Sequence, residues 1–190
     1  MRKSIIKNVT IENSFYIFAA TILLLVPLRL ALAWIFAIVI HELCHYLALK
    51  AYMVPILSVS ISAAGIKMDT EFMSGKQEFI CAIAGPLGGL IVIFFARWLP
   101  CTAICALIHS LFNLIPIYPL DGGRSLRCIL FRMFGQHNGE KISIWIGYTI
   151  LAVLLILALM LTIRFNMGIL PVVLVMLIIG KIKLANRSNK

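Results

Sequence analysis

Charged residues are scarce in this sequence, and acidic ones are the scarcest. Aspartate and glutamate number 7 among 190 residues, and charged residues of both signs make up only 13%. The hydrophobic fraction is 62% and the mean hydropathy is +1.05, far outside the range of ordinary soluble domains. The composition therefore excludes a soluble globular protein and indicates a polytopic membrane protein.

The sequence also lacks a CxxC pair and a small-residue cleavage site near its start. The five cysteines form no CxxC pair, so we expect neither a disulfide framework nor a thiolate metal site. The basic start, "MRKSIIKNVTIENSF", leads into an apolar run without a small-residue cleavage site, so we expect the first span to be retained. With about 20 residues needed for each crossing, no room remains for a soluble domain, and residues 1–190 are predicted to form one membrane domain.

Six apolar segments predict the spans, at about 15–26, 30–49, 78–98, 101–118, 142–163 and 167–180. The fourth runs into prolines and an Asp-Gly-Gly turn, so a broken span is expected over about 101–123. Within residues 56–69, apolar and polar residues alternate up to a turn at Gly65. This pattern predicts a β-hairpin. The expected fold is an all-α polytopic membrane protein of about six transmembrane helices with a small membrane-associated hairpin.

Lysine and arginine are distributed unevenly over the predicted loops. Of 17, fourteen fall on the side that carries both termini and the loops 50–77 and 121–141. The positive-inside rule then places both termini in the cytoplasm. A basic face beside anionic lipid accounts for the net charge of +10, so no nucleic-acid partner is expected.

The motif HELCH lies inside the predicted span at about 30–50. On a helix, His41 and His45 project from one face one turn apart, so both imidazoles can bind one zinc ion. Glu42 is rotated by about 100° and can reach a water on that ion. A glutamate in a span is costly, and this role gives a reason for keeping it there.

A catalytic zinc usually takes a third protein ligand. The elongated pattern HExxHxxGxxH fails, because Ala48 and Ala51 stand where glycine and histidine would be needed. Asp121 is the best candidate, since apart from Glu42 it is the only acidic residue embedded in apolar sequence. Glu71, on a predicted polar loop, is the alternative.

Three motifs together resemble the site-2 protease family of intramembrane zinc metalloproteases: HELCH at 41–45, AGPLGG at 84–89 and NLIPIYPLDGG at 113–123. The six-span layout is most similar to the stage IV sporulation protein FB branch, here without its CBS domain and without the PDZ domain of other members. The resemblance implies structural roles in these motifs for Gly85, Pro86, Pro116 and Gly122. Gly88 and Gly89 stand where the family often has a polar residue, which weakens the transfer of a substrate contact.

The resemblance implies a zinc-dependent intramembrane endopeptidase of the bacterial cell membrane, with one Zn²⁺ per chain. Glu42 would act as general base and then as general acid. Asn113 and His109, which share one helix face, would donate to the oxyanion or hold the substrate backbone. Expected partners are the lipid bilayer, a membrane-protein substrate such as a pro-transcription factor in sporulation, and a membrane-protein regulator. An open hairpin edge at Ser58 and Ser60 would accept the unwound substrate. The alternative is a non-enzymatic metal or proton carrier.

Overall fold

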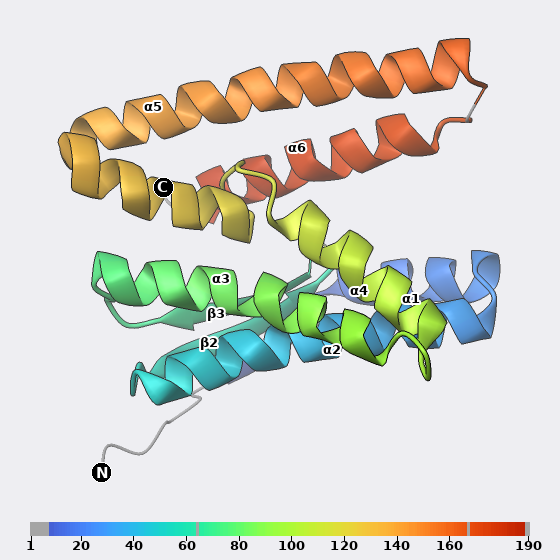
Figure 1. Ribbon diagram of the computed structural model, residues 1–190, viewed down its shortest axis with the longest axis horizontal. Helices are drawn as coiled ribbons and strands as arrows, with labels where there is room; N and C mark the ends of the chain where they lie inside the picture. The colour runs from blue at the N-terminus through green and yellow to red at the C-terminus, as the bar shows by residue number, and fades with distance from the viewer. Residues whose placement is uncertain (1–7, 64, 167, 189–190) are drawn as a thin grey trace. The chain divides into compact units, whose positions relative to one another are not determined.

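The computed structural model describes residues 8–63, 65–166 and 168–188. The chain divides into two compact units, residues 1–114 and 115–190 (Figure 1). The predicted fold class is confirmed: the chain is mostly helical and carries a small β-sheet. The single membrane domain over 1–190 stays a prediction.

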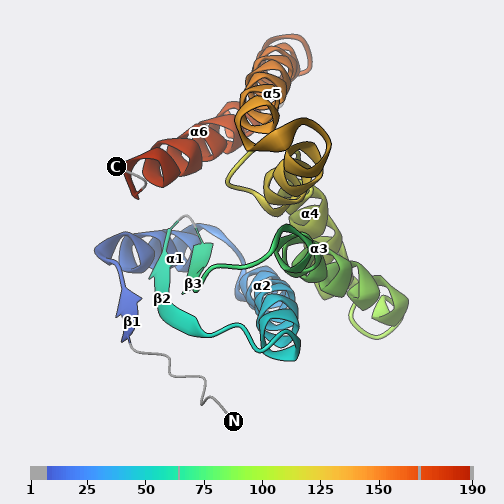
Figure 2. The ribbon, with the colours of Figure 1, turned by 90° about the vertical axis from the view of Figure 1, so that its left-hand side faces the viewer.

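The first unit is built on three mutually packed helices, α2, α3 and α4 (Figure 2). Helix α1 (Asn13–Leu25) leads through Pro27 into α2 (Leu28–Ala51). Helix α3 (Gly75–Ile91) continues into the 3-10 turn η1 (Val92–Phe95). Helix α4 spans Pro100–Asn113. Pro27 and Pro100 stand at helix starts, where the missing backbone N–H costs nothing. Ser74 and Gln77 form a capping box that starts α3.

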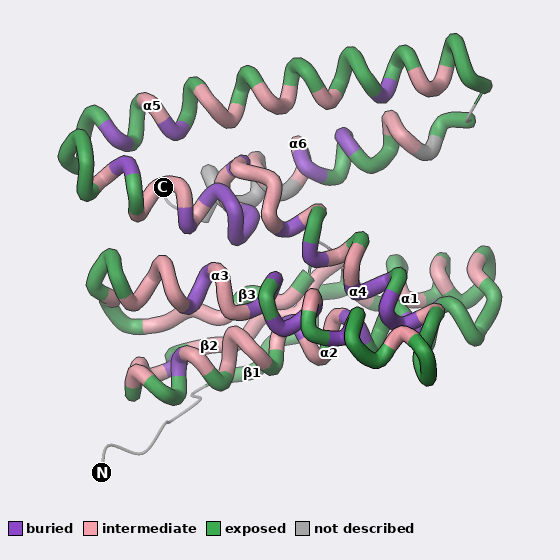
Figure 3. The backbone as a smooth tube through the Cα atoms, in the orientation of Figure 1, coloured by how far each residue is buried: buried purple, intermediate pink, exposed green. Residues whose placement is uncertain are grey.

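Glycines of the AGPLGG segment let α3 approach its two neighbours closely. A Cβ on Gly88 would lie 2.1 Å from Cys44 Sγ on α2, and one on Gly89 would lie 2.1 Å from Ser110 Oγ on α4. Buried positions concentrate where these helices face one another, whereas none of the residues of α1 is buried (Figure 3). Gly88 and Gly89 are therefore contact positions between helices, which explains why no polar side chain stands there.

The predicted hairpin is present, within a larger sheet than expected. Strands β2 (Ile56–Ser62) and β3 (Gly65–Thr70) pair antiparallel, and β1 (Asn8–Ile11) pairs parallel to the other side of β2. Val9 and Ile11 alternate with polar neighbours, but a run of four residues is too short to predict a strand by itself. Because β2 is central, the expectation of an open edge at Ser58 and Ser60 is wrong.

In the second unit, α5 (Asp121–Arg164) packs against α6 (Leu170–Ser188). The predicted loop over 121–141 is wrong, because this stretch is helical except for a break at Gly135, whose φ is 76°. At the break the chain folds back on itself: Arg127 pairs with Glu140 at 3.1 Å, and a Cβ on Gly139 would lie 2.8 Å from the backbone of Leu130. Glycine is needed at 135 for its positive φ and at 139 for this approach.

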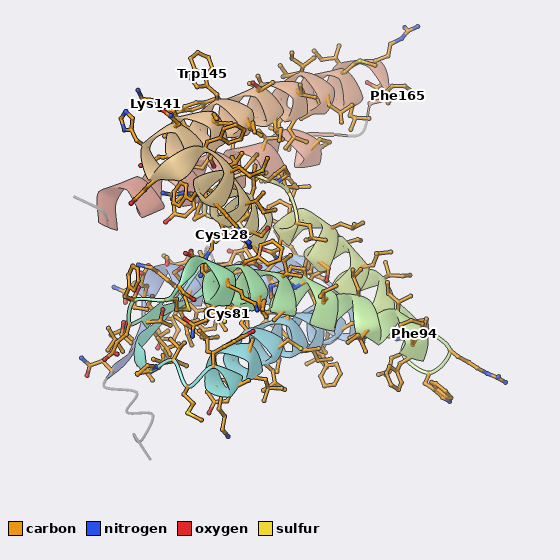
Figure 4. All side chains as sticks on the ribbon, turned by 60° about the vertical axis from the view of Figure 1, so that its left-hand side comes forward. Cys81, Phe94, Cys128, Lys141, Trp145 and Phe165 are labelled. Atoms are coloured by element: carbon orange, nitrogen blue, oxygen red, sulfur yellow. The ribbon has the colours of Figure 1, made fainter. Side chains whose placement is uncertain are left out.

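Among the described residues, three helices are long and apolar enough to cross a membrane, namely α2, Gly75–Phe95 and α5, and three shorter ones are apolar: α1, α4 and Pro171–Gly180. These six match the predicted segments in order. On α5, Lys141 and Trp145 project outward (Figure 4), and Phe165 follows about 20 residues later, a rise of about 30 Å. That is the thickness of a bilayer's hydrocarbon core, with an aromatic ring at each end.

Candidate metal centre

His41 and His45 bring their Nε2 atoms to 3.1 Å from each other on α2. Two nitrogens bound at about 2.0–2.1 Å to one tetrahedral zinc lie about 3.3 Å apart, so the pair already has the spacing of two zinc ligands. The rings meet edge to face with centroids 4.8 Å apart, and His41 is 2% exposed. The predicted pairing of these imidazoles is thus present within the first unit, and the donor set fits a metal ion.

The tautomer of His45 is set by helix α3. His45 Nδ1 lies 2.7 Å from the carbonyl oxygen of Cys81, and since a carbonyl only accepts, Nδ1 carries the proton and donates it. Nε2 therefore presents a lone pair toward His41. This is the outer-shell arrangement typical of metal-binding histidines. Sequence reasoning missed Cys81, because a main-chain carbonyl leaves no residue-type signal.

Gly85 makes room for that imidazole. A Cβ at this position would lie 2.2 Å from His45 Nε2 and 2.6 Å from two ring carbons, so any side chain would displace the ring at the nitrogen that faces His41. Pro86 follows inside α3 and is fully buried. The contact at Gly85 gives a physical reason for the structural role that the motif predicts for this residue.

Helix α4 contributes His109 and Asn113, which share one face as predicted. The His109 ring meets His41 edge to face at 4.7 Å between centroids, with Trp34 on α2 at 6.4 Å. Asn113 Nδ2 donates to the carbonyl oxygen of His109 at 3.0 Å and lies 3.1 Å from its Nε2. Both side chains therefore belong to the surroundings of His41.

Glu42 follows His41 on α2 and is partly buried. The alternative ligand of the sequence analysis, Glu71, is exposed just after β3, where its backbone N–H donates to the carbonyl oxygen of Pro55. An exposed carboxylate pays no desolvation cost and needs no metal to explain it. Of the two glutamates, only Glu42 is partly withdrawn from solvent.

In the second unit, Asp121 is buried in the first turn of α5, at 9% exposure. Arg124 lies 4.0 Å from its carboxylate, and the positive end of the helix dipole also favours the anion. A Cβ on Gly123 would lie 2.2 Å from the backbone of Ile117 and Tyr118, so the preceding loop is pressed against this turn. Gly122 and Gly123 thus form the helix start itself, and the predicted Asp-Gly-Gly turn is wrong.

Comparison with known proteins points to one family. Peptidase family M50 matches residues 81–157, which include the 113–123 motif. Zinc metalloprotease MJ0392 of Methanocaldococcus jannaschii is 29% identical over 138 residues, covering 65% of this chain and 41% of that protein. Stage IV sporulation protein FB of Bacillus subtilis is 30% identical over 149 residues, covering 70% of this chain and 49% of that protein.

One solved structure has the same fold as this chain. The site-2 protease from Methanocaldococcus jannaschii is 24% identical, has a TM-score of 0.66 and matches 95% of this chain and 94% of its own, which shows a shared fold. The chain spans 41% and 49% of the length of the two curated relatives named above.

Composition and structure define a helical membrane protein with the fold of a site-2 protease. The chain is similar to site-2 proteases: residues 81–157 match peptidase family M50, and 95% of the chain matches the fold of a solved site-2 protease. Its assignment to the sporulation branch without a CBS domain stays a prediction.

Proposed function

We propose that this chain is a zinc-dependent endopeptidase that cleaves membrane-tethered proteins within or near their transmembrane segments. The observation that carries the proposal is the pair of Nε2 atoms of His41 and His45, 3.1 Å apart beside Glu42 on a helix long and apolar enough to cross a membrane. The match of residues 81–157 to a peptidase family supports the reaction class. The name of MJ0392, zinc metalloprotease, supports the choice of metal.

Asp121 is proposed as the third zinc ligand, completing a set of two imidazoles and one carboxylate with one position open for water or substrate. Its motif supports the role, and so do its burial and the features of α5 that favour the anion. A deprotonated carboxylate is the form that binds metal.

Zinc, when bound, lowers the pKa of a held water to about 7 and polarises the scissile carbonyl. Glu42 takes the proton of the attacking water and passes it to the leaving amine. Asn113 and His109 orient the scissile peptide and donate to the oxygen on which negative charge develops. His45 keeps its position through its hydrogen bond to Cys81.

The substitution Glu42→Gln tests the proposal, because it keeps both imidazoles and removes only the proton shuttle. We expect zinc content to be unchanged and turnover to fall by about 100-fold or more. The matched control is Glu71→Gln, an identical change at an exposed position. Membrane proteomes of cells carrying wild type or Glu42→Gln would reveal the substrate as a protein that accumulates uncut, and a Gln variant with normal turnover would exclude this role.

The competing function is a metal or proton carrier. A carrier built from inverted repeats would show paired motifs in its two halves, whereas the sequence has a single HExxH and a single Asp-Gly-Gly. Zinc-dependent peptide hydrolysis by the purified chain, lost in Glu42→Gln, separates the two functions.

The proposed setting is the bacterial cell membrane with both termini in the cytoplasm, supported by the uneven distribution of lysine and arginine. Tags at both termini should resist an external protease in intact cells and be cut after permeabilisation. Cleavage in intact cells would overturn the orientation. We propose a membrane-tethered pro-transcription factor as substrate and a membrane protein as regulator; one relative, stage IV sporulation protein FB of Bacillus subtilis, is by its name a sporulation protein.

A further inference from the structure

Two adjoining apolar hollows lie on the first unit, apart from the two imidazoles. The first, of about 540 Å³, runs between α2 and the start of α4, with Arg29 among its lining residues and Val39 at a deeper level of α2. The second, of about 300 Å³, lies between α2 and α3 with η1. Phe36 and Leu99 line both, so Phe36 stands between them.

The hollows exist because small residues lie at their floors and large ones at their rims. Ala33 and Thr102, each 6% exposed, underlie the first hollow, and Gly88 contributes no side chain to the second. At the rims, Phe36 is 50% exposed and Trp98 is 71% exposed. Both volumes lie within or at the lower limit of the range of ligand sites, about 300–1,000 Å³.

Charge and depth identify the ligand class. Arg29 stands in the first turn of α2, and the ten residues from there to Val39 rise about 15 Å, which is half the hydrocarbon thickness of a bilayer. The first hollow therefore has the depth of one lipid leaflet, with a guanidinium and an interfacial tryptophan, Trp98, at its outer end. A guanidinium pairs well with a phosphate, and tryptophan prefers the headgroup level.

We propose that these two hollows form a binding site for one anionic diacyl phospholipid, with its phosphate on Arg29 and its two acyl chains on either side of Phe36. A helix of a substrate or of a second copy is about 10–12 Å wide and would need one broad groove, whereas Phe36 divides this surface into two narrow ones. The site does not depend on the peptidase function.

Titration of the full chain with phosphatidylglycerol in detergent, followed by native mass spectrometry, tests the proposal. One lipid should bind per chain, and Arg29→Gln should weaken binding about fivefold, because one cation near an anionic headgroup contributes about 1 kcal/mol. Arg97→Gln is the matched control: Arg97 is exposed directly before Trp98 and lines neither hollow. Equal effects of the two substitutions would overturn the assignment of the phosphate.

A second pair of variants tests the acyl chains. Val39→Trp fills the first hollow and should abolish retention of the lipid, whereas Leu43→Trp, at a position 49% exposed on the same helix outside both hollows, should leave it intact. Diacylglycerol, which has the chains without the phosphate, should bind wild type as weakly as phosphatidylglycerol binds Arg29→Gln. Equal binding of both lipids to wild type, or a dimer that only Val39→Trp dissociates, would overturn the proposal.

Discussion

The substitution Gly85→Ala adds one methyl group at the closest point between α3 and the proposed metal ligands. Its Cβ would lie 2.2 Å from His45 Nε2, whereas ordinary contacts begin at 3.4 Å. The imidazole must therefore retreat by roughly 1 Å, and the two ring carbons at 2.6 Å leave it little room to tilt instead. Such a retreat disturbs the 2.7 Å hydrogen bond from His45 Nδ1 to Cys81.

The expected result is a loss of metal affinity. Disturbing the outer-shell partner of a metal-binding histidine typically costs 10- to 100-fold in affinity. We therefore expect zinc affinity to fall by about 10- to 100-fold, equivalent to about 1.4–2.7 kcal/mol. Competition with a fluorescent zinc chelator on the purified chain in detergent measures this directly, alongside a thermal melt that reports on folding.

Two further glycine substitutions separate this effect from simple packing damage. Gly88→Ala disturbs the same pair of helices, but its Cβ would meet Cys44 Sγ, so it should lower the melting temperature with little change in zinc affinity. In Gly147→Ala the new Cβ meets nothing within 4 Å, so zinc affinity should not change. The melting temperature should stay the same or rise slightly, because alanine favours the helix over glycine by up to about 1 kcal/mol. Wild-type zinc affinity in folded Gly85→Ala would refute the reasoning.

Asp121→Ala should lower zinc affinity by at least about tenfold, since it removes a proposed ligand, whereas Glu71→Ala should leave it unchanged; metal analysis giving the reverse would reassign the third ligand. A pH effect is expected in the sheet. Partial burial raises the pKa of Asp69, but the Ser58 hydrogen bond and the Lys67 ammonium outweigh it and hold this pKa below its usual range. The carboxylate therefore stabilises β2–β3 pairing at pH values above the usual aspartate pKa. This contribution is lost as the pH falls through the lowered pKa of Asp69. Protection factors of the β3 amides, which correct for the intrinsic pH dependence of exchange, should fall on that acid side in wild type and fall less in Ser58→Ala, where only Lys67 still lowers the pKa.

The sequence alone determined the features that depend on composition and short spacing. Scarce charge and long apolar segments indicated the membrane class and the order of the helices, because crossing a bilayer requires runs of apolar residues. His41 and His45 were paired by helical periodicity, since residues four apart project from one face. The β2–β3 hairpin followed from strict alternation around Gly65.

Tertiary structure decided what depends on contacts distant in the chain. The parallel pairing of β1 turned β2 into a central strand, which local alternation cannot reveal. The helical course of 121–141 depends on α5 folding back at Gly135, where Arg127 meets Glu140. The tautomer of His45 is set by the carbonyl of Cys81, 36 residues away, and by the absence of a side chain at Gly85. The hydrogen bond to the Cys81 carbonyl and the space left by Gly85 both depend on the packing of α3 against α2, which local sequence patterns do not reveal.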